Sequence, residues 1–76
     1  MPKRSDKLAK LAEIEGIDLR DTEQVGSIVI DSVNPGICMN DGCEYTTQVE
    51  PDQAEGYCEE CKTKTVMSLA MLMYLI

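Results

Sequence analysis

Four cysteines in two closely spaced pairs constrain this chain of 76 residues more than any other feature. Four residues separate Cys38 from Cys43. Two residues separate Cys58 from Cys61, and fourteen lie between the two pairs. Two thiols on one tight turn can occupy two corners of a tetrahedron, and the chain has no His to add another type of ligand. We therefore predict one structural Zn²⁺ ion with all four cysteines as ligands.

Other uses of the four thiols stay open at the level of sequence. Two disulfides would suit a chain this small, and an iron–sulfur cluster also accepts four thiolates, although the spacing matches no common ferredoxin pattern. A redox-active pair at Cys58 and Cys61 is a third option, disfavoured by the two carboxylates that lie between them. The N-terminal residues lack the apolar stretch of a signal peptide, so we expect a cytoplasmic location, where metal is favoured over disulfides.

The size of the chain predicts that it needs a stabiliser beyond its hydrophobic core. A single domain of this length buries only about 60% of the surface that its unfolded form exposes. The aromatic residues are three tyrosines, with no Trp and no Phe, so the core must come from aliphatic side chains and methionines. Scaffolds of this size usually depend on a disulfide, a metal or a partner chain. We expect a small α+β domain stabilised by metal.

Residues 1–33 predict a helical arm ahead of the cysteine segment. Ser5 is a good N-cap, Leu11 lies on an apolar stripe at helical spacing, and Gly16 ends the helix. On this pattern Lys7 falls on the solvent face.

A second helix is predicted to begin at Asp21 or Thr22. Residues 24–33 leave two readings open, because their apolar side chains recur at helical spacing but are mostly β-branched. Gly26 also weakens a helix. Both helix and strand are therefore retained for this segment.

Residues 34–64 predict a zinc-ribbon-like β-hairpin that brings the two cysteine pairs together. Residues 34–36, Asn-Pro-Gly, are a turn signal. Residues 44–49 have the composition of a strand, residues 51–56 form a polar turn, and a return strand begins at Tyr57.

Residues 65–76 predict an apolar C-terminal helix that Thr65 can cap. The apolar run is about 17 Å long as a helix, well short of the ~30 Å hydrocarbon core of a bilayer, so we expect no membrane span. The segment either packs on the first helix and completes the core or forms an interface, with a homodimer through residues 66–76 as one form.

The cysteine pattern resembles the zinc-ribbon group, in which two knuckles on a β-hairpin hold one zinc ion. The resemblance covers residues 37–64, where Cys38-x4-Cys43 is followed by Tyr57-Cys58-x2-Cys61. The first knuckle is longer than the commoner Cys-x2-Cys, and Lys62 stands where the group usually has Gly. The chain is also similar to small uncharacterised bacterial or phage zinc-ribbon proteins. The resemblance implies a structural zinc, and often a place in nucleic-acid machinery.

The distribution of charge favours a protein partner over a nucleic acid. The net charge is −7, and between Asp21 and Cys61 there are ten acidic residues and no Lys or Arg, so phosphates would be repelled there. We expect a protein-binding adaptor or regulator with a basic partner and no enzymatic activity, and a phage-encoded modulator of a host protein is one form of this role. The alternative is a nucleic-acid-binding ribbon that uses the basic N-terminal residues Lys3, Arg4, Lys7 and Lys10.

Overall fold

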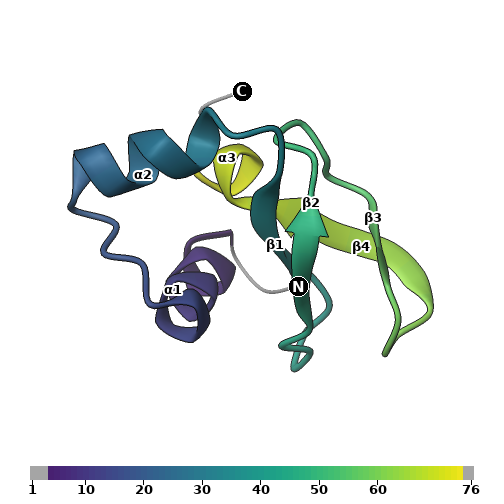
Figure 1. Ribbon diagram of the computed structural model, residues 1–76. Coiled ribbons are helices and arrows are strands. Elements are labelled where there is room, and N and C mark those ends of the chain that lie inside the picture. Colours follow the sequence, from purple (N-terminus) through teal and green to yellow (C-terminus); the bar gives the residue numbers. More distant parts are fainter. Residues whose placement is uncertain (1–3, 75–76) are drawn as a thin grey trace.

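Three short helices and four short strands make up residues 4–74, the part of the chain that this computed structural model describes. In chain order they are α1 (Arg4–Glu15), α2 (Thr22–Val29), β1 (Asn34–Cys38), β2 (Thr46–Val49), β3 (Gly56–Cys58), β4 (Thr63–Ser68) and α3 (Leu69–Leu72). The strands form one curled antiparallel sheet, and the helices gather at one side of it (Figure 1). The predicted small α+β architecture is confirmed. No helix within residues 4–74 has the length and apolar character needed to cross a membrane.

The sheet consists of two hairpins joined side by side, in the strand order β2-β1-β4-β3. β1 pairs with β2, placing Gly36 opposite Thr47, and β3 pairs with β4. The hairpins are joined by the antiparallel pair β1 and β4, in which Ile37 lies opposite Met67. Because β1 and β4 run in opposite directions, the last residue of β1 and the first residue of β4 lie at the same end of these two central strands.

The single hairpin predicted between residues 44–49 and the segment from Tyr57 is wrong. β2 pairs with β1 and β3 pairs with β4, so these two segments belong to different hairpins. The predicted turn at residues 34–36 is the buried start of β1. Pro35 is tolerated there because β1 pairs with β4 only from Gly36 onward, so its missing N–H breaks no bond to that strand.

The prediction for the C-terminal segment is also largely wrong. Residues 65–68 belong to β4, and only Leu69–Leu72 are helical, with Ser68 rather than Thr65 as the N-cap. The segment Thr-Lys-Thr-Val that opens β4 is rich in β-branched residues, and a short apolar run does not separate strand from helix. The residues that the structure buries here are Val66, Met67, Ser68, Leu69, Ala70 and Leu72. The segment therefore completes the core, and little of it is exposed for a homodimer interface. Leu75 and Ile76 lie outside the described residues.

The N-terminal arm is helical, and residues 24–29 prove to be helix rather than strand. Asp21 is the N-cap of α2, and its carboxylate accepts hydrogen bonds from the backbone N–H groups of Glu23 and Gln24. Gly16 ends α1 with a positive φ of 69°, the conformation predicted for a C-terminal cap.

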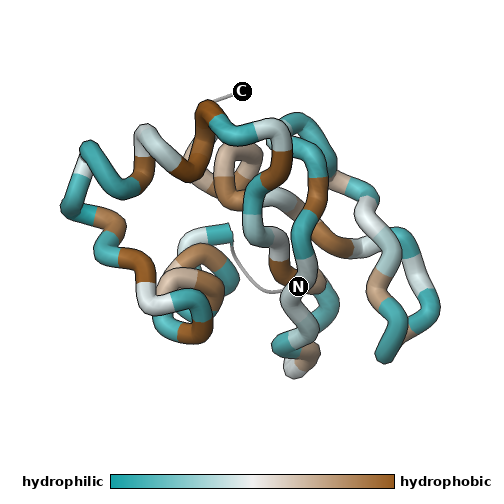
Figure 2. The backbone as a smooth tube through the Cα atoms, viewed as in Figure 1, coloured by the Kyte–Doolittle hydropathy of each residue, from teal (hydrophilic) through white to brown (hydrophobic). Residues whose placement is uncertain are grey.

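Two apolar clusters hold these elements together. In the larger cluster, Leu11 of α1 packs against Ile37 of β1 and against Leu69 and Leu72 of α3. The smaller cluster contains Val66 together with two of the cysteines. Figure 2 shows the hydrophobic stretches of β4 and α3 crossing the middle of the molecule. The first cluster docks the helices, and the second supports the cysteine site.

Candidate metal centre

The turns of the two hairpins carry all four cysteines. In the first cysteine turn (residues 38–43), Cys38 ends β1 and Cys43 lies in the loop before β2. In the second cysteine turn (residues 58–61), Cys58 ends β3 and Cys61 lies just before β4. The β1–β4 pairing brings the two turns to the same end of the central strands of the sheet.

The four sulfur atoms form one cluster rather than two bonded pairs. All four Sγ atoms lie within 4.8 Å of one another, and the four residues are free thiols. The Sγ atoms of Cys38 and Cys61 are 3.9 Å apart, and those of Cys43 and Cys58 are 3.8 Å apart. Each of these close contacts joins one turn to the other. The arrangement can hold one metal ion.

Backbone geometry specific to each turn positions the thiols. Gly42, the residue before Cys43, has a φ of 80°, the left-handed conformation that favours glycine. Directly after the second turn, Lys62 has a φ of 58°, which is unusual for a residue with a Cβ. Its N–H donates to the carbonyl oxygen of Cys58 at 2.7 Å. The position at which zinc ribbons usually have Gly is thus one where the chain needs a glycine-like conformation.

Hydrogen bonds to sulfur complete the surroundings of the cluster. The hydroxyl of Thr65 lies 3.1 Å from the Sγ of Cys38, and the N–H of Cys61 donates to the Sγ of Cys58 at 3.3 Å. Such bonds orient metal ligands and moderate the negative charge on sulfur. Cys38 and Cys58 are fully buried, whereas Cys43 and Cys61 are half-buried. The centre therefore has a protected inner side and a more open outer side.

Burial and mutual contact perturb the acidity of the thiols. Burial would raise the pKa of Cys38, but hydrogen bonds, above all that of Thr65, outweigh it and lower the pKa to about 7. A backbone hydrogen bond lowers the pKa of Cys43, but burial and the neighbouring thiols together raise it to about 12. Burial also raises the pKa of Cys58. Ionisation of one thiol therefore opposes ionisation of its neighbours, and four thiolates at these distances require a cation.

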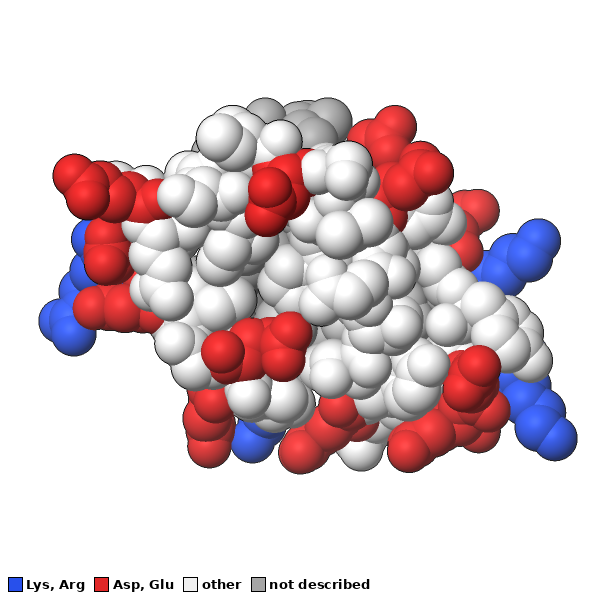
Figure 3. Space-filling view, in the orientation of Figure 1, with Lys and Arg blue, Asp and Glu red and all other residues white. Residues whose placement is uncertain are grey.

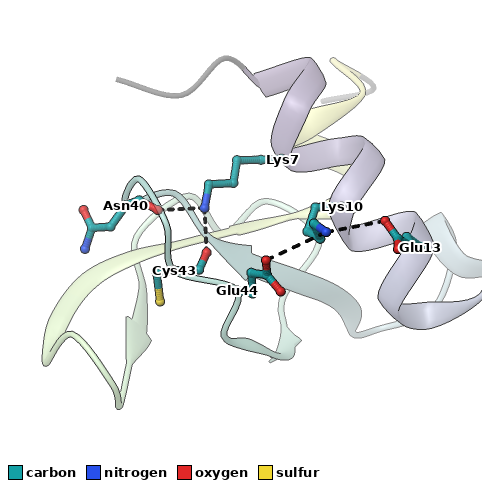
Figure 4. A network of polar contacts seen from close by, with 6 residues as sticks. All are labelled: Lys7, Lys10, Glu13, Asn40, Cys43 and Glu44. Carbon is teal, nitrogen blue, oxygen red and sulfur yellow. Dashed lines mark hydrogen bonds and ion pairs between the residues drawn. The ribbon is translucent and has the colours of Figure 1, made fainter.

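Two residues near the centre were not identified from the sequence. Thr65 was assigned to a helix cap but contacts Cys38 from β4. Lys7 was placed on the solvent face, which is wrong: it is only 6% exposed and reaches the first cysteine turn (Figure 4). The sequence did carry a signal, since Lys7 and Leu11 are one helical turn apart and so lie on the same face of α1.

Comparison with protein-family models, curated proteins and solved structures finds no match to this chain. The likeness to zinc ribbons consequently rests on the cysteine turns themselves.

Proposed function

We propose that this chain is a zinc-ribbon-like domain in which Cys38, Cys43, Cys58 and Cys61 hold one structural Zn²⁺ ion, and that the domain binds a basic protein partner. The cluster of four Sγ atoms within 4.8 Å of one another carries the first part of the proposal. The predominantly acidic surface charge supports the second part.

The donor set fits zinc in number, type and spacing. Four thiolates around Zn²⁺ at a Zn–S distance of about 2.3 Å lie about 3.8 Å apart, and the sulfur pairs Cys43–Cys58 and Cys38–Cys61 are separated by 3.8 and 3.9 Å. A shell closed by four thiolates leaves no open position for water or substrate, which is typical of a structural zinc rather than a catalytic one. Bound zinc would supply the cation that the mutually opposed thiols need, and would tie the two hairpins together.

The folded surface is more acidic than the composition alone indicates. All fourteen Asp and Glu residues are exposed. On the face that Figure 3 shows, acidic side chains lie around and among uncharged residues, with Lys and Arg only at the edges of the view. Two cations of the predicted basic segment are engaged within the molecule: Lys7 is buried, and Lys10 contacts Glu13 and Glu44. Lys3 lies outside the described residues. These contacts disfavour the nucleic-acid alternative and favour a basic partner.

A shallow groove of about 300 Å³ offers a specific place for such a partner. Ile17, Ile28 and Val33 give it an apolar lining, Glu15 and Asp31 add carboxylates, and no Lys or Arg lines it. Charge complementarity therefore favours a segment that presents a Lys or Arg beside an apolar side chain. We place the contact with the basic protein partner in this groove.

Elemental analysis of untagged protein tests the metal. We expect one zinc per chain, and we expect chelation to unfold the domain, as in other small structural-zinc domains. Well under one zinc per chain, or a fold that survives chelation unchanged, contradicts the zinc proposal.

Charge reversal tests the partner. The test uses substitutions of exposed residues, because truncating the chain at Thr65 would remove buried core residues and unfold the domain. The unchanged chain should capture a protein from the native host, and raised salt should weaken this capture. The double variant Glu15→Lys/Asp31→Lys should no longer capture that protein or crosslink to it. Asp52→Lys with Glu55→Lys is the control, because it changes the net charge equally at exposed positions outside the groove. If both double variants capture the partner equally, the contact does not lie in the groove. Salt-dependent binding of DNA or RNA in place of a protein contradicts the protein-binding role.

A further inference from the structure

Lys7 connects helix α1 to the first cysteine turn. Its Nζ donates to the carbonyl oxygen of Asn40 at 2.7 Å and to that of Cys43 at 2.6 Å. The same Asn40 oxygen also accepts the N–H of Cys43 at 3.1 Å, so the ammonium lies where the turn closes on itself. In Figure 4 the side chain extends from α1 to the two carbonyl groups.

The ammonium of Lys7 is buried without a carboxylate partner. Within residues 4–74 the ion pairs involve Lys10 and Arg20 but not Lys7. Every acidic residue of the chain is exposed, whereas Lys7 is only 6% exposed. A buried charge is unfavourable unless an opposite charge lies close by. Carbonyl oxygens satisfy its hydrogen bonds but provide no net negative charge.

The cysteine cluster is the buried source of negative charge if the proposed zinc site is correct, whereas the carboxylates that line the same pocket as Lys7, those of Asp6, Asp41 and Glu44, are exposed to solvent. Four thiolates and one Zn²⁺ leave two negative charges, and one of the four sulfurs belongs to Cys43, whose carbonyl oxygen Lys7 contacts. Packing alone does not call for Lys at this position, because Leu11 already anchors α1 in the core. An uncharged side chain of similar length would fill the same space.

We infer, building on the proposed zinc site, that Lys7 is a positioning residue of the metal centre. Its ammonium compensates the charge of the loaded centre and holds the first cysteine turn in the form that binds metal. Zinc binding and the docking of α1 on the sheet then stabilise each other, since coupling between two equilibria is reciprocal.

Zinc affinities from competition with a chromophoric chelator test this role. Lys7→Met should weaken zinc binding by about 10–100-fold, the range typical of residues that orient metal ligands. Lys10→Met removes the same charge from the same helix at a partly exposed ion pair, and should weaken binding less than about fivefold. Lys7→Arg retains the charge and should restore the affinity to within about fivefold of the unchanged protein. Equal affinities of Lys7→Met and Lys10→Met, or no recovery by Lys7→Arg, overturn the inference.

The Co²⁺ form gives a readout that does not depend on stability. If the charge of Lys7 acts on the centre through the turn whose carbonyl oxygens it binds, it stabilises the thiolate electrons, so Lys7→Met should move the thiolate-to-Co²⁺ charge-transfer band to longer wavelength, whereas Lys10→Met should leave it in place. An unmoved band in Lys7→Met assigns Lys7 to the fold alone and overturns the inference. If Lys7→Met does not fold even with excess zinc, the inference is tested by NMR on the unchanged zinc-loaded protein. Lys7 ammonium hydrogens that exchange with water far more slowly than those of exposed Lys62 support the inference, and equal exchange overturns it.

Failure of this inference is distinguishable from failure of the zinc site. If the unchanged protein does not bind stoichiometric zinc, the proposed metal centre itself is refuted. An unchanged protein that binds one zinc tightly, with Lys7→Met matching Lys10→Met, removes only the role of Lys7.

Discussion

Gly36 lies where three neighbours leave no room for a side chain, and replacing it with alanine should destabilise the domain. A Cβ at this position would lie 2.8 Å from Val49 Cγ2, 2.9 Å from the Met67 carbonyl oxygen and 2.9 Å from Val66 Cγ1. Carbon atoms in ordinary contact are about 3.5–4.0 Å apart. Val49 can shift, but the Met67 oxygen belongs to the backbone of β4, which is paired with β1 at this point. Overpacking of this kind costs about 1–3 kcal/mol, out of a total stability of about 4–11 kcal/mol for a domain of this length.

Urea unfolding of the zinc-loaded protein measures this loss. With an m-value of about 1 kcal/mol/M, the midpoint of Gly36→Ala should fall by about 1–3 M. Adding Val49→Ala should not restore it, because the contact with the Met67 oxygen is unchanged. Gly26→Ala is the matched control: a Cβ there meets nothing within 4 Å, and alanine should stabilise α2 by about 0.5–1 kcal/mol. A Gly36→Ala protein within about 0.5 kcal/mol of the unchanged protein refutes the packing argument.

Three further predictions concern the cysteine turns. Cys58→Ser should reduce zinc affinity by more than about 100-fold in chelator competition, since it removes a ligand rather than a supporting residue, and a smaller loss contradicts four-thiolate binding. The pKa values of Cys43 and Cys58 are raised above the usual 9.0, so between pH 7 and 9 both thiols must lose a proton to bind zinc. Affinity should therefore rise with pH by at least about a hundredfold per unit in this window, and a shallower slope in titrations at several pH values counts against the assignment. Lys62→Gly should raise stability in urea by up to about 1 kcal/mol, because φ is 58° there, and a lower midpoint would contradict the proposed strain.

The cysteine cluster was predictable from the sequence because its signal is local. Each pair spans a single turn, and Gly42 marks a left-handed residue within the first turn. The approach of the two pairs followed from the four-ligand chemistry of the metal, without any knowledge of the sheet. The helices α1 and α2 were likewise recognisable from spacing and caps, with Asp21 as the N-cap of α2.

The strand pairing was not predictable because it depends on contacts far apart in the chain. Asn-Pro-Gly at residues 34–36 has the local preference of a turn, and the close packing of Val49 and Val66 around Gly36 overrides that preference. β4 merges a polar β-branched segment with an apolar one, so Ser68, the N-cap of α3, is the one residue that marks the boundary between strand and helix. The burial of Lys7 escaped prediction because charge suggested solvent, although its spacing from Leu11 indicated the core.

The joint between β1 and β4 has a consequence for the order in which the chain assembles. Partners within each hairpin are close in sequence, whereas Ile37 must find Met67 across a longer loop. Closing longer loops carries a larger entropy loss, so we expect the hairpins to form first and their association to limit the folding rate. Since each hairpin carries two of the four thiols, a zinc ion caught by one would tether the other as it arrives. Zinc would then hold the two hairpins together during folding. Refolding should be faster with metal than without it, and unfolding should be slower.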